Sequence, residues 1–258
     1  MPQTKIVFFD IDGTLIDMQA KKITPKMLET LHRLQDRGIK ICIATGRSPM
    51  VLPKIDGVAF DAYLTFNGSL CYDRKGVIFS NPIPHKDVVR FIQNAAALGR
   101  PVCVSTRDRL AANGTDTDLT DYFFIANESV PVADDFDAVC AEDIYQLMLG
   151  CRPKDYPALL DGAPGAKIAA WWDRAVDVIP AGGGKGIGIE KMLAYYGLDK
   201  AEALAFGDGN NDREMLQAVG IGVAMENGSP ELKAIADEIC GPVYEDGIYH
   251  YCADKGLI

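Results

Sequence analysis

The sequence predicts an α/β protein: a doubly wound, mostly parallel sheet of the Rossmann-like, three-layer kind, with an α+β domain inserted into it. Short apolar runs that suit buried strands alternate with helical patterns, and the first of these runs end at polar residues or glycine. The regular alternation loosens from about residue 82 to residue 180 and resumes after Gly182. This arrangement indicates a core that is split in sequence by an insertion.

The N-terminal segment is typical of a β-α-β unit. Thr24-Pro25 opens a helical pattern, which Gly38 closes. The strands expected here, each with the polar residue that follows it, are residues 5–9 with Asp10, residues 39–44 with Thr45, and residues 63–66 with Asn67. In a parallel sheet the carboxyl ends of the strands meet at one edge, where the ligand crevice lies.

The C-terminal segment repeats the pattern. The elements expected here are a helix over about 186–196, a strand over 203–206, a helix over 213–219 and a strand over 221–224. We therefore predict a catalytic core formed by residues 1–81 and 182–258, and a cap domain at residues 82–181 that selects the substrate. Within the cap we predict a helix near residues 86–98. Its acidic stretch at 116–121 is expected to be a solvated loop, with a loop that enters the active site as the alternative.

Charge and cysteine content narrow the classes of partner. The chain of 258 residues carries 26 basic and 36 acidic side chains, a formal charge of −10, which disfavours a nucleic-acid partner. Its seven cysteines are scattered and form no C-x-x-C pair, so we expect neither a disulfide framework nor a zinc site. This use of cysteine indicates a cytoplasmic location. No apolar run of about 18 residues predicts a membrane span. The oligomeric state is not determined by the sequence.

Two acids follow the first strand, in the run Asp10-Ile-Asp-Gly-Thr14. Glycine after Asp12 lets the backbone turn, so that both carboxylates can reach one pocket, where one can attack a substrate while the other moves protons. Taken alone, the run is equally typical of a strand-ending turn. Together with Thr45, Lys185 and the acidic run that ends at Asp212, it favours a catalytic site.

A carboxylate nucleophile that attacks a phosphate ester needs cations around it. We expect Mg²⁺ to be held by Asp10, the backbone carbonyl of Asp12, and Asp208, with Lys185 as a fixed positive charge. Asp212 would pair with Lys185 or with a water molecule bound to the metal. Candidate hydrogen-bond donors to the phosphoryl group are Thr45, the amide of Gly46, and Asn211. Arg47 is expected near the phosphate, with a role in its own loop as the alternative.

The motifs resemble those of a known family. Asp10-Ile-Asp-Gly-Thr14, Thr45, Lys185 and Gly207-Asp-Gly-Asn-Asn-Asp212 look like the four ordered motifs of the haloacid dehalogenase superfamily. Further runs, Ala44-Thr-Gly-Arg47, Asn67-Gly68 and Glu245-Asp-Gly247, resemble its Cof-type branch, which carries a large α/β cap between the second and third motifs.

This resemblance implies chemistry through an aspartyl phosphate. Asp10 would attack phosphorus, and Asp12 would protonate the leaving alcohol and then activate water. The resemblance assigns magnesium to Asp10, Asp12 and Asp208. It assigns phosphate contacts to the backbone of Ile11 and to Thr45, Gly46, Lys185 and Asn211.

The sequence thus predicts a magnesium-dependent phosphatase for sugar phosphates or similar small phosphorylated metabolites. A phosphomutase, which shares the nucleophile, and a regulator that binds a phosphate ester without turnover are the alternatives. The glycine-rich run at 182–186 is not a nucleotide-binding P-loop, because Gly186 stands where that motif requires Ser or Thr. We expect it to be a hinge that also carries Lys185.

Overall fold

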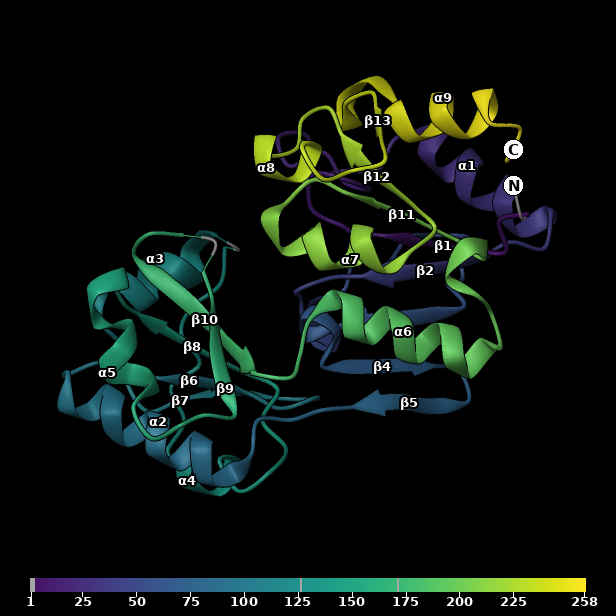
Figure 1. The fold of residues 1–258 in the computed structure, drawn as a ribbon. Coiled ribbons are helices and arrows are strands. Elements are labelled where there is room, and N and C mark those ends of the chain that lie inside the picture. The colour runs from purple at the N-terminus through teal and green to yellow at the C-terminus, as the bar shows by residue number, and fades with distance from the viewer. Residues whose placement is uncertain (1–2, 126, 171) are drawn as a thin grey trace. The chain divides into compact units, whose positions relative to one another are not determined.

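A computed structural model describes residues 3–125, 127–170 and 172–258. The chain folds as two compact units (Figure 1). Unit 1 consists of Met1–Arg47, Pro53–Ser80 and Gly184–Ile258, and unit 2 of Ser48–Leu52 and Asn81–Gly183. The predicted fold class is confirmed: an α/β core is interrupted in sequence by an α+β domain.

Unit 1 is built on an eight-stranded sheet with the order β13-β12-β11-β1-β2-β3-β4-β5. Its strands are β1 (Ile6–Phe9), β2 (Lys40–Ala44), β3 (Ala62–Thr65), β4 (Leu70–Asp73), β5 (Gly76–Ser80), β11 (Ala203–Gly207), β12 (Ile221–Met225) and β13 (Glu238–Cys240). The strands from β13 to β3 run parallel, whereas β4 and β5 form an antiparallel extension. The carboxyl ends of β1, β2 and β11 therefore meet at one edge.

Helices cover both faces of this sheet, which gives three layers (Figure 1). They are α1 (Pro25–Asp36), α6 (Lys185–Tyr196), α7 (Arg213–Ala218), α8 (Pro230–Lys233) and α9 (Gly247–Asp254). The side chains of Ile6 and Phe8 pack in one cluster with residues of α6, α7 and α8. Successive residues of a strand point to opposite faces, so Val7 and Phe9, which are also buried, face the other layer. That layer contains α1 and α9.

The bounds of these elements agree closely with the predictions from sequence. The expected N-terminal helix is α1, and Thr24 accepts a hydrogen bond from the N–H of Met27 at its start, as an N-cap does. Proline follows directly in the first turn, where its missing N–H is not needed.

Unit 2 has a five-stranded antiparallel sheet with the order β7-β6-β8-β10-β9. Its strands are β6 (Cys103–Ser105), β7 (Leu110–Ala112), β8 (Gln146–Gly150), β9 (Ala166–Ala169) and β10 (Ala175–Pro180), and its helices are α2 (His85–Ala97), α3 (Thr117–Ile125), α4 (Phe136–Val139) and α5 (Tyr156–Leu160). Residues of α2, α4 and α5 pack against one face of the sheet. Leu119 and Phe123 of α3 pack with Cys103 and Met148 in a separate cluster.

The prediction for the acidic stretch at 116–121 is wrong. Most of it belongs to α3, and Asp118 is only 8% exposed. Its carboxylate accepts hydrogen bonds from three arginines, Arg100, Arg152 and Arg174, at 2.9–3.2 Å. These cations come from distant parts of the chain, so the sequence pattern of the acidic stretch did not reveal them.

Among the described residues, no helix is long and apolar enough to cross a membrane. All seven cysteines are described, and each is a buried free thiol.

Asp118→Asn tests whether this carboxylate holds unit 2 together. Hydrogen bonds from Arg152, together with Arg174 and Arg100, lower the pKa of Asp118 against the opposing effect of burial. We expect the free energy of unfolding at neutral pH to fall by about 1–3 kcal/mol. The folded pKa is below the ordinary value, so this stabilisation is present above that value and is lost as pH falls through the lowered pKa. The difference between variant and wild type should therefore vanish in acid.

Urea unfolding monitored by tryptophan fluorescence is the measurement. Both tryptophans of the chain lie in the sequence span of unit 2. Asp121→Asn is the matched control, because that side chain is 44% exposed and bonds to Arg174 alone among these arginines, so its loss should cost less. Equal unfolding midpoints for wild type and Asp118→Asn would contradict the prediction.

Candidate active site

The candidate site lies at the carboxyl edge of the parallel strands of unit 1. Asp10 directly follows β1, and its backbone N–H donates to the carbonyl of Phe206 in β11 at 3.0 Å. This bond extends the strand ladder to Asp10, so the backbone of Asp10 is held by the sheet itself. Its side chain is nearly buried, at 8% exposed.

A buried lysine links two of the acids. The Nζ of Lys185 lies 2.6 Å from Oδ1 of Asp10 and 2.5 Å from Oδ1 of Asp212. The side chain of Lys185 is fully buried. Burial acts to lower the pKa of this lysine, but the charges of Asp10 and Asp212 outweigh it, and the pKa is raised. Lys185 is therefore a permanent cation in the site.

Asp208 approaches the first strand tip through Thr14, whose hydroxyl donates to its Oδ1 at 2.9 Å. Gly13 adopts a φ of 88°, and a Cβ at this position would overlap the carboxylate of Asp208. Glycine is therefore required here both by conformation and by space. Burial raises the pKa of Asp208 to about 6, and the negative charge of Asp212 acts in the same direction.

The spacing from Asp208 to Asp212 has a local cause. The run Asn210–Asp212 forms a 3₁₀ turn, which brings the Asp212 carboxylate back over its start. Oδ2 of Asp212 accepts from the N–H groups of Asp208 and Gly209 at 3.0 and 2.9 Å. One carboxylate oxygen of Asp212 thus holds the loop, and the other oxygen binds Lys185.

The carboxylates of Asp10, Asp208 and Asp212 fit a divalent metal ion. Each offers one oxygen, and these oxygens all lie within 4.8 Å of one another. Burial raises the pKa of Asp10 well above its usual value; Lys185 opposes this shift, while Asp212 and Asp208 add to it. Hard oxygen donors with unrelieved negative charge are the set that Mg²⁺ prefers. These three residues would hold such an ion.

Asp12, unlike these three acids, is paired with an arginine. Both oxygens of its carboxylate accept from Arg47, Oδ2 from Nε at 2.8 Å and Oδ1 from Nη2 at 2.6 Å. The Asp12 side chain is not part of the metal-competent group of described residues. The predicted metal contact through its backbone carbonyl stays a prediction, and so does the predicted phosphate contact of Arg47.

The predicted phosphate-binding groups lie around the same edge. Thr45 is buried, and its hydroxyl oxygen accepts from the N–H of Arg47 at 3.1 Å. The N–H groups of Ile11 and Gly46 donate to no residue in the described part of the chain. Asn211 reaches Asn67, with its Nδ2 3.4 Å from Oδ1 of that residue. Unpaired N–H donors at strand tips are typical of sites for anions.

Sequence analysis missed Asn227, whose side chain links two backbone segments next to the site. Its Nδ2 donates to the carbonyl of Gly13 at 2.8 Å, and its Oδ1 accepts from the N–H of Val243 at 2.9 Å. Asn227 follows the end of β12 by two residues, so the available signal was a polar residue shortly after a strand, although it is not the residue that directly follows it.

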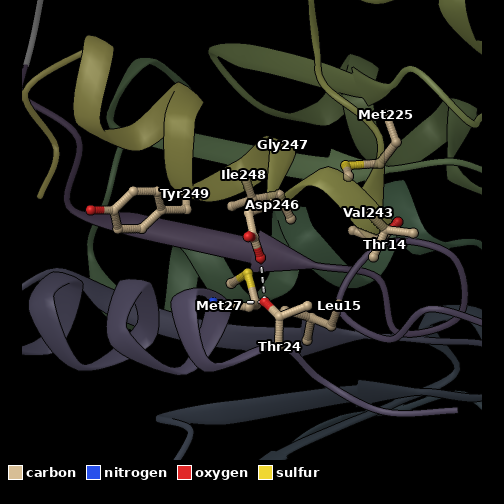
Figure 2. Close-up of a pocket in the computed structure, with 10 residues that line it drawn as sticks. All are labelled: Thr14, Leu15, Thr24, Met27, Met225, Val243, Asp246, Gly247, Ile248 and Tyr249. Atoms are coloured by element: carbon tan, nitrogen blue, oxygen red, sulfur yellow. Dashed lines mark hydrogen bonds between the residues drawn. The ribbon is translucent and has the colours of Figure 1, made fainter. Parts of the chain in front are cut away.

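A small pocket of unit 1 adjoins this site but does not contain its acids (Figure 2). Its volume of about 10 Å³ has room for about one water molecule. Thr24 donates to Asp246 at 2.5 Å across it, which links the start of α1 to the start of α9. Asp246 has a φ of 56°, and a Cβ on Gly247 would overlap the carbonyl of Gly241. The Glu245-Asp-Gly247 run therefore has a packing role.

Comparison with known proteins decides the family. Residues 7–252 match the family model described as haloacid dehalogenase-like hydrolase. The chain belongs to the haloacid dehalogenase-like hydrolases. The predicted resemblance is thus confirmed.

Relatives of this haloacid dehalogenase-like hydrolase match over nearly its full length. YkrA of Bacillus subtilis (strain 168) is 34% identical over 257 residues, 99% of either chain. The 5-amino-6-(5-phospho-D-ribitylamino)uracil phosphatase YitU of the same organism is 28% identical over 95% of either chain. The solved structure of the subclass IIB sugar phosphatase BT4131 is 29% identical, covers 99% of this chain and 100% of its own, and has a TM-score of 0.87. The chain is a phosphatase, as predicted.

The raised pKa of Asp208 and the crowding of three acids predict how metal affects stability. The folded state binds the Asp208 proton more tightly than the unfolded state, so this group makes the metal-free protein less stable as pH rises toward about 6. A metal ion competes with that proton and should bind more tightly above this pH. We expect MgCl₂ at about 100-fold excess over its Kd to stabilise the protein by about 2–3 kcal/mol.

Thermal unfolding with and without MgCl₂, at pH 5 and pH 7.5, measures this effect. Asp208→Asn should raise the Tm of the metal-free protein, because one repelling charge is removed, and should abolish most of the magnesium shift. The control is Asp56→Asn, an exposed aspartate, which should leave both values unchanged. A magnesium shift that is equal in Asp208→Asn and wild type would overturn the metal assignment.

Proposed function

We propose that the chain is a magnesium-dependent phosphatase that hydrolyses sugar phosphates or similar small phosphorylated metabolites through an aspartyl phosphate on Asp10. The observation that carries this proposal is the state of the Asp10 carboxylate. Oδ1 is bound by Lys185, whereas Oδ2 accepts no hydrogen bond from any residue that the structure describes. One oxygen is therefore anchored and the other is available for attack.

Asp10 acts as the nucleophile in this proposal. Attack by Oδ2 on phosphorus forms the acyl-phosphate bond while the bond from phosphorus to the ester oxygen breaks. The attacking carboxylate must approach a dianion, so its negative charge needs compensation. Lys185 supplies a fixed cation next to Asp10, and Asp212 holds that cation from its other side.

Asp12 moves the protons. It protonates the leaving oxygen in the first step and takes a proton from the attacking water in the second. Both of its oxygens accept from Arg47, so at least one must leave this pair before Asp12 can give or take a proton. We propose that Arg47 holds Asp12 before substrate binds and then turns toward the phosphate, whose geometry suits a guanidinium group.

The remaining polar groups orient the phosphoryl group. The unpaired N–H groups of Ile11 and Gly46, the hydroxyl of Thr45 and the carboxamide of Asn211 are all donors at the same sheet edge. Asp10, Asp208 and Asp212 would hold Mg²⁺, with a further contact from the Asp12 carbonyl. When bound, that ion supplies charge neutralisation for the phosphoryl oxygens.

Substrate selection belongs, in this proposal, to the cap at residues 82–181. The core carries the chemistry, and its groups all act on the phosphoryl group that every substrate of this class shares. The activities of two relatives, a sugar phosphatase and a phosphatase of a phosphoribitylamino-uracil, support small phosphorylated metabolites as the class.

Two substitutions separate the two chemical roles. Asp10→Asn removes the nucleophile, and we expect kcat to fall by a factor of about 10⁴ or more. Asp12→Asn removes the acid and base, and we expect a fall of about 10²–10⁴ together with accumulation of phosphorylated Asp10, because water is no longer activated. Phosphate release and mass spectrometry of the quenched protein measure these effects.

The substrate panel should contain sugar phosphates, nucleotides and pyridoxal phosphate, each with MgCl₂, and Asp56→Asn is again the control. Turnover by Asp10→Asn at the wild-type rate would refute the proposed nucleophile. A rearranged sugar phosphate without free phosphate would show a phosphomutase instead. Tight binding of an ester with no release would show a regulator without turnover.

A further inference from the structure

A strained turn stands beside the candidate site. Phe66, Asn67 and Gly68 follow β3 with φ angles of 50°, 51° and 90°, so three consecutive residues are left-handed. Such a conformation is unfavourable for Phe and only tolerated by Asn. Strain of this kind persists only where surrounding contacts impose it, and it is concentrated at functional sites.

The contacts that impose the turn come from the other strand tips. The N–H of Asn67 donates to the carbonyl of Thr45 and that of Phe66 to the carbonyl of Arg47, both at 3.0 Å. On the opposite side, a Cβ on Gly68 would overlap the carbonyl of Gly184, directly before Lys185. The turn is therefore fixed between the tip of β2 and the start of α6.

The carboxamide of Asn67 is left with an unused donor. Its Oδ1 accepts a hydrogen bond from Nδ2 of Asn211 at 3.4 Å. Its Nδ2 lies 3.1 Å from where a Cβ of Gly46 would be, and it donates to no residue in the described segments. The residue as a whole is 8% exposed, so its carboxamide is held in a nearly buried position at the edge of the site. An amide donor that no protein acceptor engages is available to an acceptor on the substrate.

We propose that Asn67 contacts the substrate: its Nδ2 donates a hydrogen bond to an oxygen of the bound phosphoryl group. The strained turn exists to hold this amide between Gly46 and Asn211, the two neighbouring donors. This inference rests on the proposed function, because it adds a group to the same phosphoryl site.

The chemistry of the side chain suits a phosphate dianion. An amide donor adds no charge, so it can stand in a site already rich in carboxylates without a further counter-ion. A carboxylate of the same shape would instead repel the phosphoryl group at close range. Among residues other than glycine, Asn is one of the few that accept the left-handed conformation that the turn requires.

Asn67→Gly is the decisive variant, because glycine keeps the left-handed backbone and deletes only the carboxamide. We expect kcat/KM for p-nitrophenyl phosphate to fall about 10- to 100-fold, as for loss of a hydrogen bond to a charged group. The matched control is Asn127→Gly, an exposed asparagine of unit 2 with a φ of 60°, which should leave kcat/KM unchanged. Thermal unfolding should give closely similar Tm values for both variants and the wild type.

Asn67→Asp is the second variant, and it decides the question if Asn67→Gly does not fold. It keeps the size of the side chain and the oxygen that accepts from Asn211, and it replaces the donor by a charge. We expect at least a 100-fold loss of kcat/KM, whereas a purely structural role for Asn67 would leave this variant close to wild type.

Binding of inorganic phosphate, measured as a rise in Tm with MgCl₂ present, separates this inference from the proposed function. Phosphate binding that Asn67→Gly weakens supports the contact even if no substrate is hydrolysed. An active wild type with Asn67→Gly and Asn67→Asp both within about threefold of it would overturn the contact and leave the phosphatase intact. A wild type that neither binds phosphate nor releases it would overturn both.

Discussion

The site depends on one buried cation between two carboxylates. Lys185 has no access to solvent, so its charge is tolerable only because Asp10 and Asp212 lie within hydrogen-bond distance. The same bonds set the positions of all three side chains. Removing any one of them would leave a buried charge without its partner. The requirement to neutralise Lys185 therefore fixes the position of the Asp10 carboxylate, which is the nucleophile in the proposed function.

A second constraint is close approach of backbone at the edge of the sheet. Gly13 lies against the Asp208 carboxylate, and Gly68 lies against the carbonyl of Gly184. A side chain at either position would push apart segments that meet at this edge of the sheet. The left-handed Asn67 belongs to the same arrangement. Glycine and strained positions thus occur where strand tips meet, because the space there is reserved for functional groups.

The two units shift the pKa of a largely buried aspartate in opposite directions. In unit 2, Asp118 is surrounded by three arginines, which hold its pKa below the usual value. In unit 1, Asp208 has other acids as neighbours, and burial raises its pKa to about 6. The first arrangement is satisfied by the protein alone and is structural. In the second arrangement the carboxylates are not fully neutralised by protein cations, as expected of a site that binds a metal cation.

The sequence by itself determined the α/β class of the core, its five central strands, and the polar residues at their tips, because the apolar periodicity and the motif order are local properties of the chain. It did not predict β4, β5 and β13 or the helices α8 and α9. It also pointed to Asp10, Lys185 and Asp208 as one group. Only the tertiary structure decided that Asp12 pairs with Arg47, that Asn227 clamps Gly13, and that Asp118 is buried among arginines. These contacts join residues far apart in sequence, and no local pattern encodes which distant side chain will meet a given charge.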